Sequence, residues 1–339
     1  MDNKRIGRHT VCLTNRPAIT ASYSVVGDKE GKGPLGDCFD EVLSDPYDGQ
    51  KSWELAESSM MARAIQGAVS KGGLKNDDID YLFAGDLLNQ CSSAHFAMRD
   101  LPIPFFGVFG ACSTMAESLS LAAMAVDAGY SRRSVAATSS HFCSAEKQFR
   151  FPLEYGGQRP LTAQSTVTGA GAAVISATGT GPRVHCITTG KVIDKGVKDA
   201  NNMGAAMAPA AADSIYYHFA ETGKKPADYD LIVTGDLGSV GKKMLVDLLY
   251  DQGYDITGNY EDCGCMIYDP ETDQNAGASG CGCSAVVLGS KLLGDLNGGK
   301  ISNLLFVATG ALMNATTSQQ GMSIPCIAHA ISIKSEGSR

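Results

Sequence analysis

The sequence lacks the features that mark membrane-spanning and nucleic-acid-binding proteins. Its longest apolar stretches are interrupted by Asp, Lys or Gly, well short of the roughly 20 apolar residues of a membrane-spanning helix. Its Lys and Arg residues form no cluster that could follow a phosphate backbone, and its formal net charge is −8. The opening residues, MDNKRIGRHT, contain no apolar signal-peptide segment. We therefore expect a soluble or peripheral protein with no nucleic-acid partner.

Aromatic residues are also scarce, at 7% with a single Trp, whereas glycine is abundant, with 39 residues. This composition favours tight turns and close packing of small side chains. Eleven cysteines without a signal peptide are more typical of a reducing compartment than of a secreted disulfide scaffold. We expect free thiols.

Periodicity predicts a helix over residues 52–73, where apolar residues recur at helical spacing and two glycines end the pattern. β-branched and small residues predict strands elsewhere. The predicted strands cover residues 18–27, 78–90, 134–142 and 166–178, with first and last strands of a second half over 184–193 and 326–333.

The chain contains an internal repeat. The segment IDYLFAGDL over residues 79–87 recurs as YDLIVTGDL over 229–237. A second correspondence aligns Cys112-Ser113 with Cys283-Ser284. Two copies of one strand-helix unit predict two similar α/β layers packed together.

Cys112 follows a short apolar run and opens a helix of small residues, in GVFGACSTMAESL. The first turn of a helix presents unpaired backbone N–H groups and the positive end of the helix dipole, which favour a thiolate and can hold an oxyanion. This placement predicts a nucleophilic cysteine. The alternative is a buried thiol that packs as a small apolar side chain.

Together these features resemble the thiolase superfamily, which includes thiolases and ketoacyl-ACP synthases. GVFGACSTMAE resembles the nucleophile elbow of these proteins, and TVTGAGAAVIS resembles their glycine-rich strand. The resemblance implies an α/β protein with a duplicated five-layer α/β/α/β/α fold, whose central helices begin near Cys112 and Gly282. It divides the chain into halves over residues 1–180 and 181–339. It also implies a homodimer paired through the first-half sheet, with SVAATSS (134–140) little exposed.

The chain departs from the enzymes of this superfamily in its second half. Synthase-like sequences carry a His after the strand that here reads LIVTG, and an Asn at the loop that here reads GASG. This chain has Gly235-Asp236 and Ala278-Ser279 at those places. Gly and Ala transfer no protons, and an anionic Asp opposes an enolate. The departure predicts a non-catalytic pocket; the alternative is an active acyltransferase or condensing enzyme that uses Cys112 on an acyl thioester.

A narrower resemblance is to a family of stage V sporulation proteins, carried by six motifs in order, among them EKQFRFPLEYGGQRP and SIPCIAHA. It implies binding of dipicolinic acid, free or with calcium, for its uptake into the developing bacterial spore. It also implies, as partners, membrane proteins of the stage V sporulation A complex. The implied location is peripheral, at the cytoplasmic face of the forespore or spore inner membrane.

Dipicolinate is an aromatic ring with two carboxylates, so its site needs cations and an apolar slot. His141 ends a predicted strand beside the elbow, where open α/β folds collect ligand groups; a hydrogen-bonded core histidine is the alternative. In the next loop three cations alternate with Phe149, Phe151 and Tyr155, a pattern that suits such a ligand. The alternative is a loop whose charges are only solvated. The predicted ligand-binding residues are Cys112, Ser113, His141, Lys147, Arg150, Arg159 and Asp236.

Four cysteines form two C-x-C pairs, Cys263 with Cys265 and Cys281 with Cys283. Four thiolates can hold a structural zinc ion, but the usual spacing is C-x-x-C. The repeat also gives Cys283 another place, at a helix start equivalent to that of Cys112. We expect no metal site and no cofactor.

Overall fold

The computed structural model describes residues 4–149, 159–269 and 275–336. Two mixed sheets of five strands form its framework. The first has the order β2 (Ala18–Val26), β8 (Gly169–Ser176), β6 (Arg133–Ser140), β4 (Tyr81–Gly85) and β5 (Phe105–Gly107). The second has the order β9 (Arg183–Thr188), β14 (Cys326–Lys334), β13 (Asn303–Ala311), β10 (Leu231–Thr234) and β11 (Tyr260–Asp262).

The two sheets repeat the same strand directions. In each sheet the first three strands are antiparallel neighbours and the last three are parallel neighbours. The sheets meet through a single residue pair, Ala18 and Arg183. Short strands complete the arrangement: β1 (Thr10–Cys12) pairs with β9, β3 (Glu41–Val42) with β2, and β7 (Ser165–Thr166) with β12 (Ala278–Ser279).

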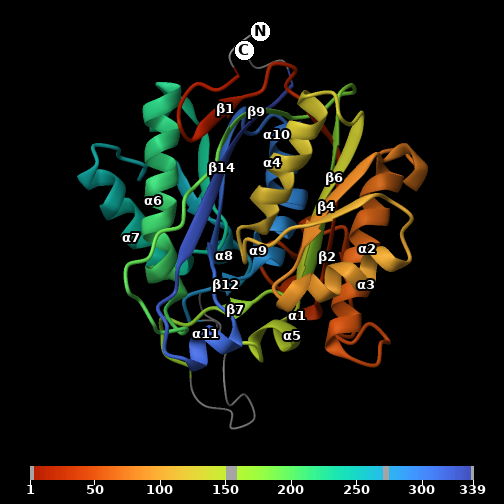
Figure 1. Ribbon diagram of the computed structural model, residues 1–339, viewed down its shortest axis with the longest axis horizontal. Helices are drawn as coiled ribbons and strands as arrows, with labels where there is room; N and C mark the ends of the chain where they lie inside the picture. The colour runs from red at the N-terminus through yellow and green to blue at the C-terminus, as the bar shows by residue number, and fades with distance from the viewer. Residues whose placement is uncertain (1–3, 150–158, 270–274, 337–339) are drawn as a thin grey trace.

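Helices lie on both outer faces and between the sheets (Figure 1). The first sheet carries α2 (Trp53–Lys71) and α3 (Ser92–Arg99), and the second carries α6 (Met203–Thr222) and α7 (Gly238–Asp251). Between the sheets lie α4 (Thr114–Asp127) and α9 (Cys281–Val287). The five-layer fold predicted from the sequence is therefore confirmed, and the predicted helix and strands fall within a few residues of α2, β2, β4, β6, β8, β9 and β14.

The remaining helices are short. After α9 the chain forms a π-helical turn, η5 (Leu288–Leu292), and continues as α10 (Leu293–Asn297). The other α-helices are α1 (Asp28–Gly31), α5 (Phe142–Glu146), α8 (Cys263–Met266) and α11 (Ala315–Gln319). The 3₁₀ turns are η1 (Gly36–Cys38), η2 (Asn76–Asp78), η3 (Asn89–Cys91) and η4 (Pro226–Asp228).

Small side chains let the central helices touch both sheets. In α4 ten of fourteen residues are buried, and most of these ten are Ala, Ser or Thr.

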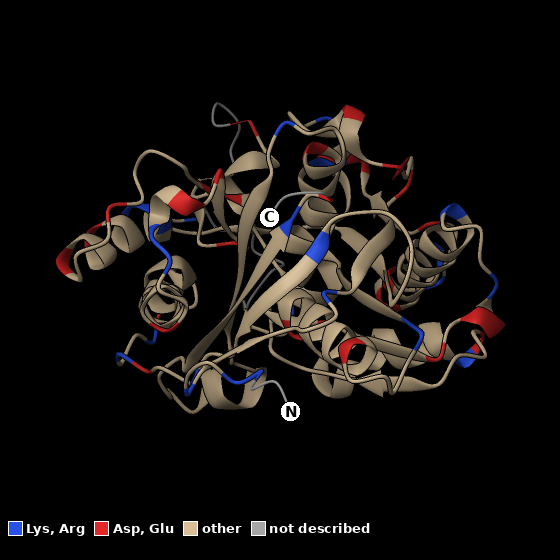
Figure 2. Cartoon of the chain, turned by 90° about the horizontal axis from the view of Figure 1, so that it is seen from above, with Lys and Arg blue, Asp and Glu red and all other residues tan. Residues whose placement is uncertain are grey.

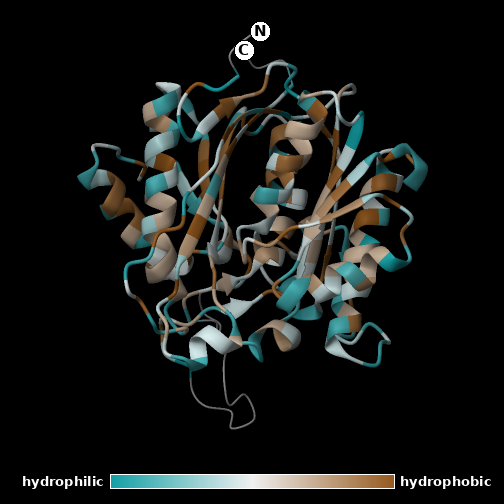
Figure 3. Cartoon of the chain, viewed as in Figure 1, coloured by the Kyte–Doolittle hydropathy of each residue, from teal (hydrophilic) through white to brown (hydrophobic). Residues whose placement is uncertain are grey.

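 Three of these buried residues are the alanines Ala116, Ala122 and Ala123. The other central helix, α9, packs closely on the first sheet. A Cβ added at Gly171 of β8 would lie 2.6 Å from the backbone C and O of Ala285 in α9. Figure 3 shows the apolar residues gathered on the strands and on the helices between them.

The expectation of free thiols is wrong for one pair of cysteines. Cys12 of β1 and Cys186 of β9 lie directly opposite each other, with a Cα–Cα distance of 4.1 Å, and form a disulfide. The other nine cysteines are free. The pairing depends on the register of β1 against β9, which joins residues far apart in the chain.

Charged residues of both signs lie along the outer helices and loops when the molecule is viewed from the end that carries the termini (Figure 2). Among the described residues, no helix combines the length and the apolar character needed to cross a bilayer.

Packing of β8 on α9 is testable with two glycine substitutions. We expect Gly171→Ala to lower the free energy of unfolding by about 1–3 kcal/mol, because its Cβ overlaps the backbone of Ala285. Gly294→Ala in α10 is the control: no described atom lies within 4 Å of its new Cβ, and alanine favours a helix by up to about 1 kcal/mol. Urea unfolding measures both, and equal effects of the two changes would contradict the close packing.

Candidate functional site

Cys112 lies in a tight elbow between β5 and α4. Ala111, just before it, has a φ of +52°, a conformation that costs energy for a residue with a side chain. Hydrogen bonds hold the elbow: the Ser113 hydroxyl donates to the Gly110 carbonyl at 2.6 Å, and the Thr114 hydroxyl donates to the Ala111 carbonyl at 2.6 Å. Ser113, predicted to bind ligand, is thus used to fix the turn.

Asp236 faces Cys112 from the end of β10. Its carboxylate is fully buried and accepts hydrogen bonds from the Ser279 hydroxyl (2.9 Å), the Gly280 N–H (2.9 Å) and the Thr309 hydroxyl (2.8 Å). The Cys112 thiol lies near this carboxylate, and each group affects the pKa of the other. The structure therefore brings together Cys112 and Asp236, two of the residues that the sequence analysis singles out.

The thiol of Cys112 is held in its protonated form. Burial raises its pKa well above the usual value, and the negative charge of Asp236 raises it further. The prediction that the helix dipole favours a thiolate here is wrong: α4 begins only at Thr114, and the field of the nearby carboxylate opposes ionisation.

A small cavity adjoins Cys112, with a volume of about 30 Å³, room for about two water molecules. Its walls combine apolar side chains with amides and hydroxyls. The described lining comprises Leu87, Asn89, Phe109, Ala111, Cys112, Gln148, Phe149, Thr166, Met203, Ser279, Ala311, Met313 and Asn314. Sequence reasoning missed the three amides, Asn89, Gln148 and Asn314, because they come from three segments far apart in the chain and only the fold brings them together.

His141 lies outside the described lining of this cavity. It is buried at the N-cap of α5, where its Nδ1 accepts from the Cys143 N–H at 3.1 Å and its Nε2 lies 2.9 Å from the Pro46 carbonyl. Both ring nitrogens are therefore used, and burial lowers the pKa of His141. The structure favours the alternative of a hydrogen-bonded core histidine.

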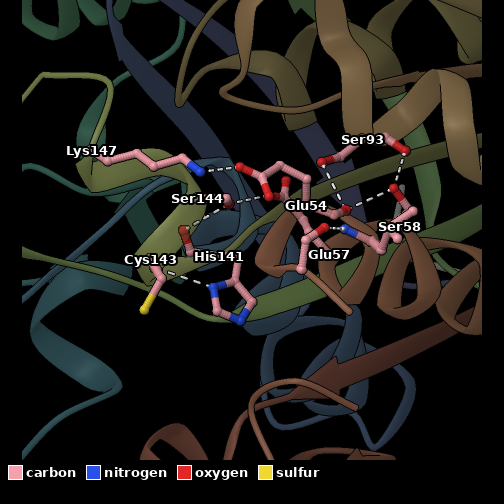
Figure 4. Close-up of polar contacts among 10 residues, drawn as sticks. Glu54, Glu57, Ser58, Ser93, His141, Cys143, Ser144 and Lys147 are labelled. Carbon is pink, nitrogen blue, oxygen red and sulfur yellow. Dashed lines mark hydrogen bonds and ion pairs between the residues drawn. The ribbon is translucent and has the colours of Figure 1, made fainter. Parts of the chain in front are cut away.

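The predicted cations near α5 are engaged with carboxylates. Lys147 forms an ion pair with Glu54 (Figure 4). Arg159 donates to Glu146 at 2.7 Å and its guanidinium lies 5.0 Å from the ring centroid of Phe142. Arg150, with the aromatic residues Phe151 and Tyr155, lies outside the described residues.

A second buried carboxyl group, not singled out in the sequence, lies near Asp236. Asp262 accepts from the Thr234 hydroxyl and from the N–H groups of Leu237 and Gly238, and burial raises its pKa to about 6. Within the described part of the chain, no three His, Cys, Asp or Glu side chains are grouped so as to hold a metal ion.

Comparison with known proteins gives two levels of similarity. A family model described as stage V sporulation protein AD matches residues 7–334. Stage V sporulation protein AD of Bacillus subtilis (strain 168) is 46% identical over 334 residues, which cover 98% of this chain and 99% of that protein.

Solved structures are similar in fold. The 3-oxoacyl-[acyl-carrier-protein] synthase III of Aquifex aeolicus VF5 gives a TM-score of 0.58 at 12% identity, covering 94% of this chain and 99% of that one. A variant of OleA from Xanthomonas campestris gives a TM-score of 0.61 at 13% identity, covering 95% and 98%. At these identities the similarity shows a thiolase-type fold and nothing about activity.

Replacing Asp236 with a neutral residue tests whether its charge raises the pKa of the Cys112 thiol. We expect Asp236→Asn to increase the alkylation rate of Cys112 by iodoacetamide at pH 8 by about tenfold or more, because one pKa unit corresponds to tenfold more thiolate. Peptide mass spectrometry measures the modification. Asp251→Asn, at an exposed residue at the end of α7, is the control, and an unchanged rate in a folded Asp236→Asn variant would contradict the interpretation.

Proposed function

The chain belongs to the stage V sporulation protein AD family, and from this we propose that it is a non-catalytic thiolase-fold protein that binds dipicolinic acid, free or with calcium, for uptake into the developing spore. The observation that carries this proposal is the buried Asp236 against the thiol of Cys112. A condensing enzyme needs a reactive thiolate and proton-transferring partners. Here the thiol is kept protonated and its neighbour is a carboxyl group held by three donors.

The remaining pocket has features that suit a flat aromatic acid. Phe109 and Phe149 provide ring faces, and the amides of Asn89, Gln148 and Asn314 can donate to carboxylate oxygens. Burial raises the pKa of Asp236, which adjoins this pocket through Cys112. Since the cavity holds only about two waters, a ring enters it only if a wall side chain moves.

The edge of the first sheet suits pairing with a second copy. Strand β5 is the last strand of that sheet, and its Phe106 is 52% exposed, with Phe109 nearby at 44%. Phe106 stacks on Phe83 with ring centroids 5.1 Å apart. An exposed edge strand with aromatic side chains is a common pairing surface, so the proposed assembly is a homodimer joined along β5. The burial of residues 134–140 arises within one chain and does not bear on this point.

The proposed setting is the cytoplasmic face of the forespore or spore inner membrane. There the protein would work with membrane proteins of the stage V sporulation A complex. This part of the proposal rests on family membership.

Ligand binding is measured by ultraviolet difference titration with dipicolinate, with and without Ca²⁺. We expect saturable binding, weakened by about 0.5–1.5 kcal/mol in Cys112→Ser, the effect of one hydrogen bond. Arg150→Ala should cost about 1.5–3 kcal/mol, the effect of a charge-assisted bond, whereas the exposed Arg99→Ala should cost nothing measurable.

The same proteins incubated with acyl-CoA distinguish the enzymatic alternative. We expect no acyl adduct on Cys112 by intact mass. An adduct on Cys112, or absence of any dipicolinate binding by the wild type, would overturn the proposal.

The proposed dimer is tested by light scattering at micromolar concentration. We expect twice the chain mass for the wild type and a single-chain mass for Phe106→Asp, because a charge at the apolar edge opposes pairing. Tyr130→Asp, at a residue 78% exposed elsewhere on the surface, should leave the dimer intact. A wild-type monomer would rule the assembly out.

A further inference from the structure

The short helix α5 is fastened to α2 at two points one helical turn apart. On the outside, Glu54 of α2 forms an ion pair with Lys147, the C-cap residue of α5. On the inside, Glu57 of α2 accepts from the Ser144 hydroxyl of α5 at 2.6 Å and from the Ser139 hydroxyl of β6 at 3.0 Å. Figure 4 shows both attachments side by side.

The position of α5 determines one wall of the Cys112 cavity. Gln148 and Phe149 follow α5 directly, and both line that cavity. The Gln148 N–H bonds to the Ala145 carbonyl at 2.9 Å, so this wall continues the turn of α5. A displacement of α5 therefore carries the wall with it.

The inner attachment is made by a carboxyl group with no accessible surface. The titratable groups that face Glu57 are Asp86 after β4 and the thiol of Cys281 in α9. Cys91 in η3 and His95 in α3 face Asp86, and Lys147 engages Glu54. Burial and the charge of Asp86 raise the pKa of Glu57 to about 8.

We propose that Glu54 and Glu57 form a clamp that sets the position of α5, and that the inner point, Glu57, is a positioning residue whose ionisation releases α5 and opens the Cys112 pocket. The inference rests on the proposed use of that pocket as the ligand site. Glu57 is buried beside Asp86, and α5 packs against it through the Ser144 hydroxyl. Displacing α5 hydrates the carboxylate, so loss of the proton favours the open arrangement.

Thermodynamic linkage gives the direction in which pH changes the opening of α5 and the pH range over which it does so. The closed arrangement binds the Glu57 proton up to about pH 8, whereas a hydrated carboxyl group loses it near pH 4.3. Opening therefore releases one proton between these values, and the opening equilibrium rises about tenfold per pH unit until it levels off near pH 8. The same coupling means that Glu57 lowers the stability of the closed form as pH rises through this range.

Hydrogen exchange of residues 142–149, followed by mass spectrometry, tests the clamp without any ligand. After correction for intrinsic exchange, we expect wild-type protection to fall about tenfold per unit from pH 6 to 8 and to level off above it. Glu57→Gln keeps the shape and the serine contacts but carries no charge, so its protection should not depend on pH. Glu117→Gln is the matched control, because Glu117 of α4 is also partly buried, with a pKa raised by burial.

A second measurement connects the clamp to the pocket. The rate of Cys112 alkylation in the wild type, divided by the rate in Glu57→Gln at the same pH, should rise about tenfold per unit over the same range, because the thiol chemistry cancels in the ratio. Ser144→Ala, which removes the inner attachment from the α5 side, should lower α5 protection at pH 6.

Three results would overturn the inference: pH-independent protection in the wild type, a pH response that survives in Glu57→Gln, or one that is also lost in Glu117→Gln. A constant alkylation ratio would refute the link to the pocket. None of these measurements uses dipicolinate, so the clamp can fail while the proposed ligand binding stands, and the reverse holds as well.

Discussion

The close approach of two sheets to one layer of central helices is the constraint on which this structure depends. It is possible only where backbone meets backbone. A Cβ at Gly310 of β13 would lie 2.1 Å from the Gly110 carbonyl in the elbow, and one at Gly235, just after β10, would lie 3.2 Å from the Ser284 Cβ in α9. These contacts bring the end of β10, with Asp236, against Cys112, so the chemistry of the site is a result of the same packing that holds the halves together.

The arrangement keeps the shape of a thiolase-type elbow while its thiol is held in the protonated form. The strained turn at Ala111 and its hydroxyl contacts persist. What differs is the electrostatic surrounding of the thiol, where a buried carboxyl group lies in place of a proton-transferring base. A pocket of this kind is left with shape, amide donors and apolar walls, which are the properties of a binding site.

The fold was predictable because the repeat and the small-residue helices are local patterns in the sequence. Cys112 was singled out by its place at the start of a helix of small residues, and Asp236 by the family comparison, because it lies where synthase-like sequences carry a His. The amides of the pocket and the Cys12–Cys186 pair were not predictable, because each depends on how distant segments meet. Glu57 was missed for another reason: in WELAESS an acidic residue on a helix is typical of a solvated face, and only the contacts of β6 and α5 bury it. His141 and Lys147, both predicted to bind ligand, are engaged with Pro46 and Glu54.

The disulfide has a consequence for how the chain behaves when it is cut. It joins residues 174 positions apart, and so it closes nearly the whole first half into a covalent ring. A single break of the backbone anywhere inside the ring leaves the two pieces attached, and the cut molecule keeps its full mass until the bond is reduced. The protein therefore tolerates one proteolytic cut between Cys12 and Cys186 without losing a fragment. After a cut beyond Cys186, only non-covalent packing holds the C-terminal piece to the rest of the chain.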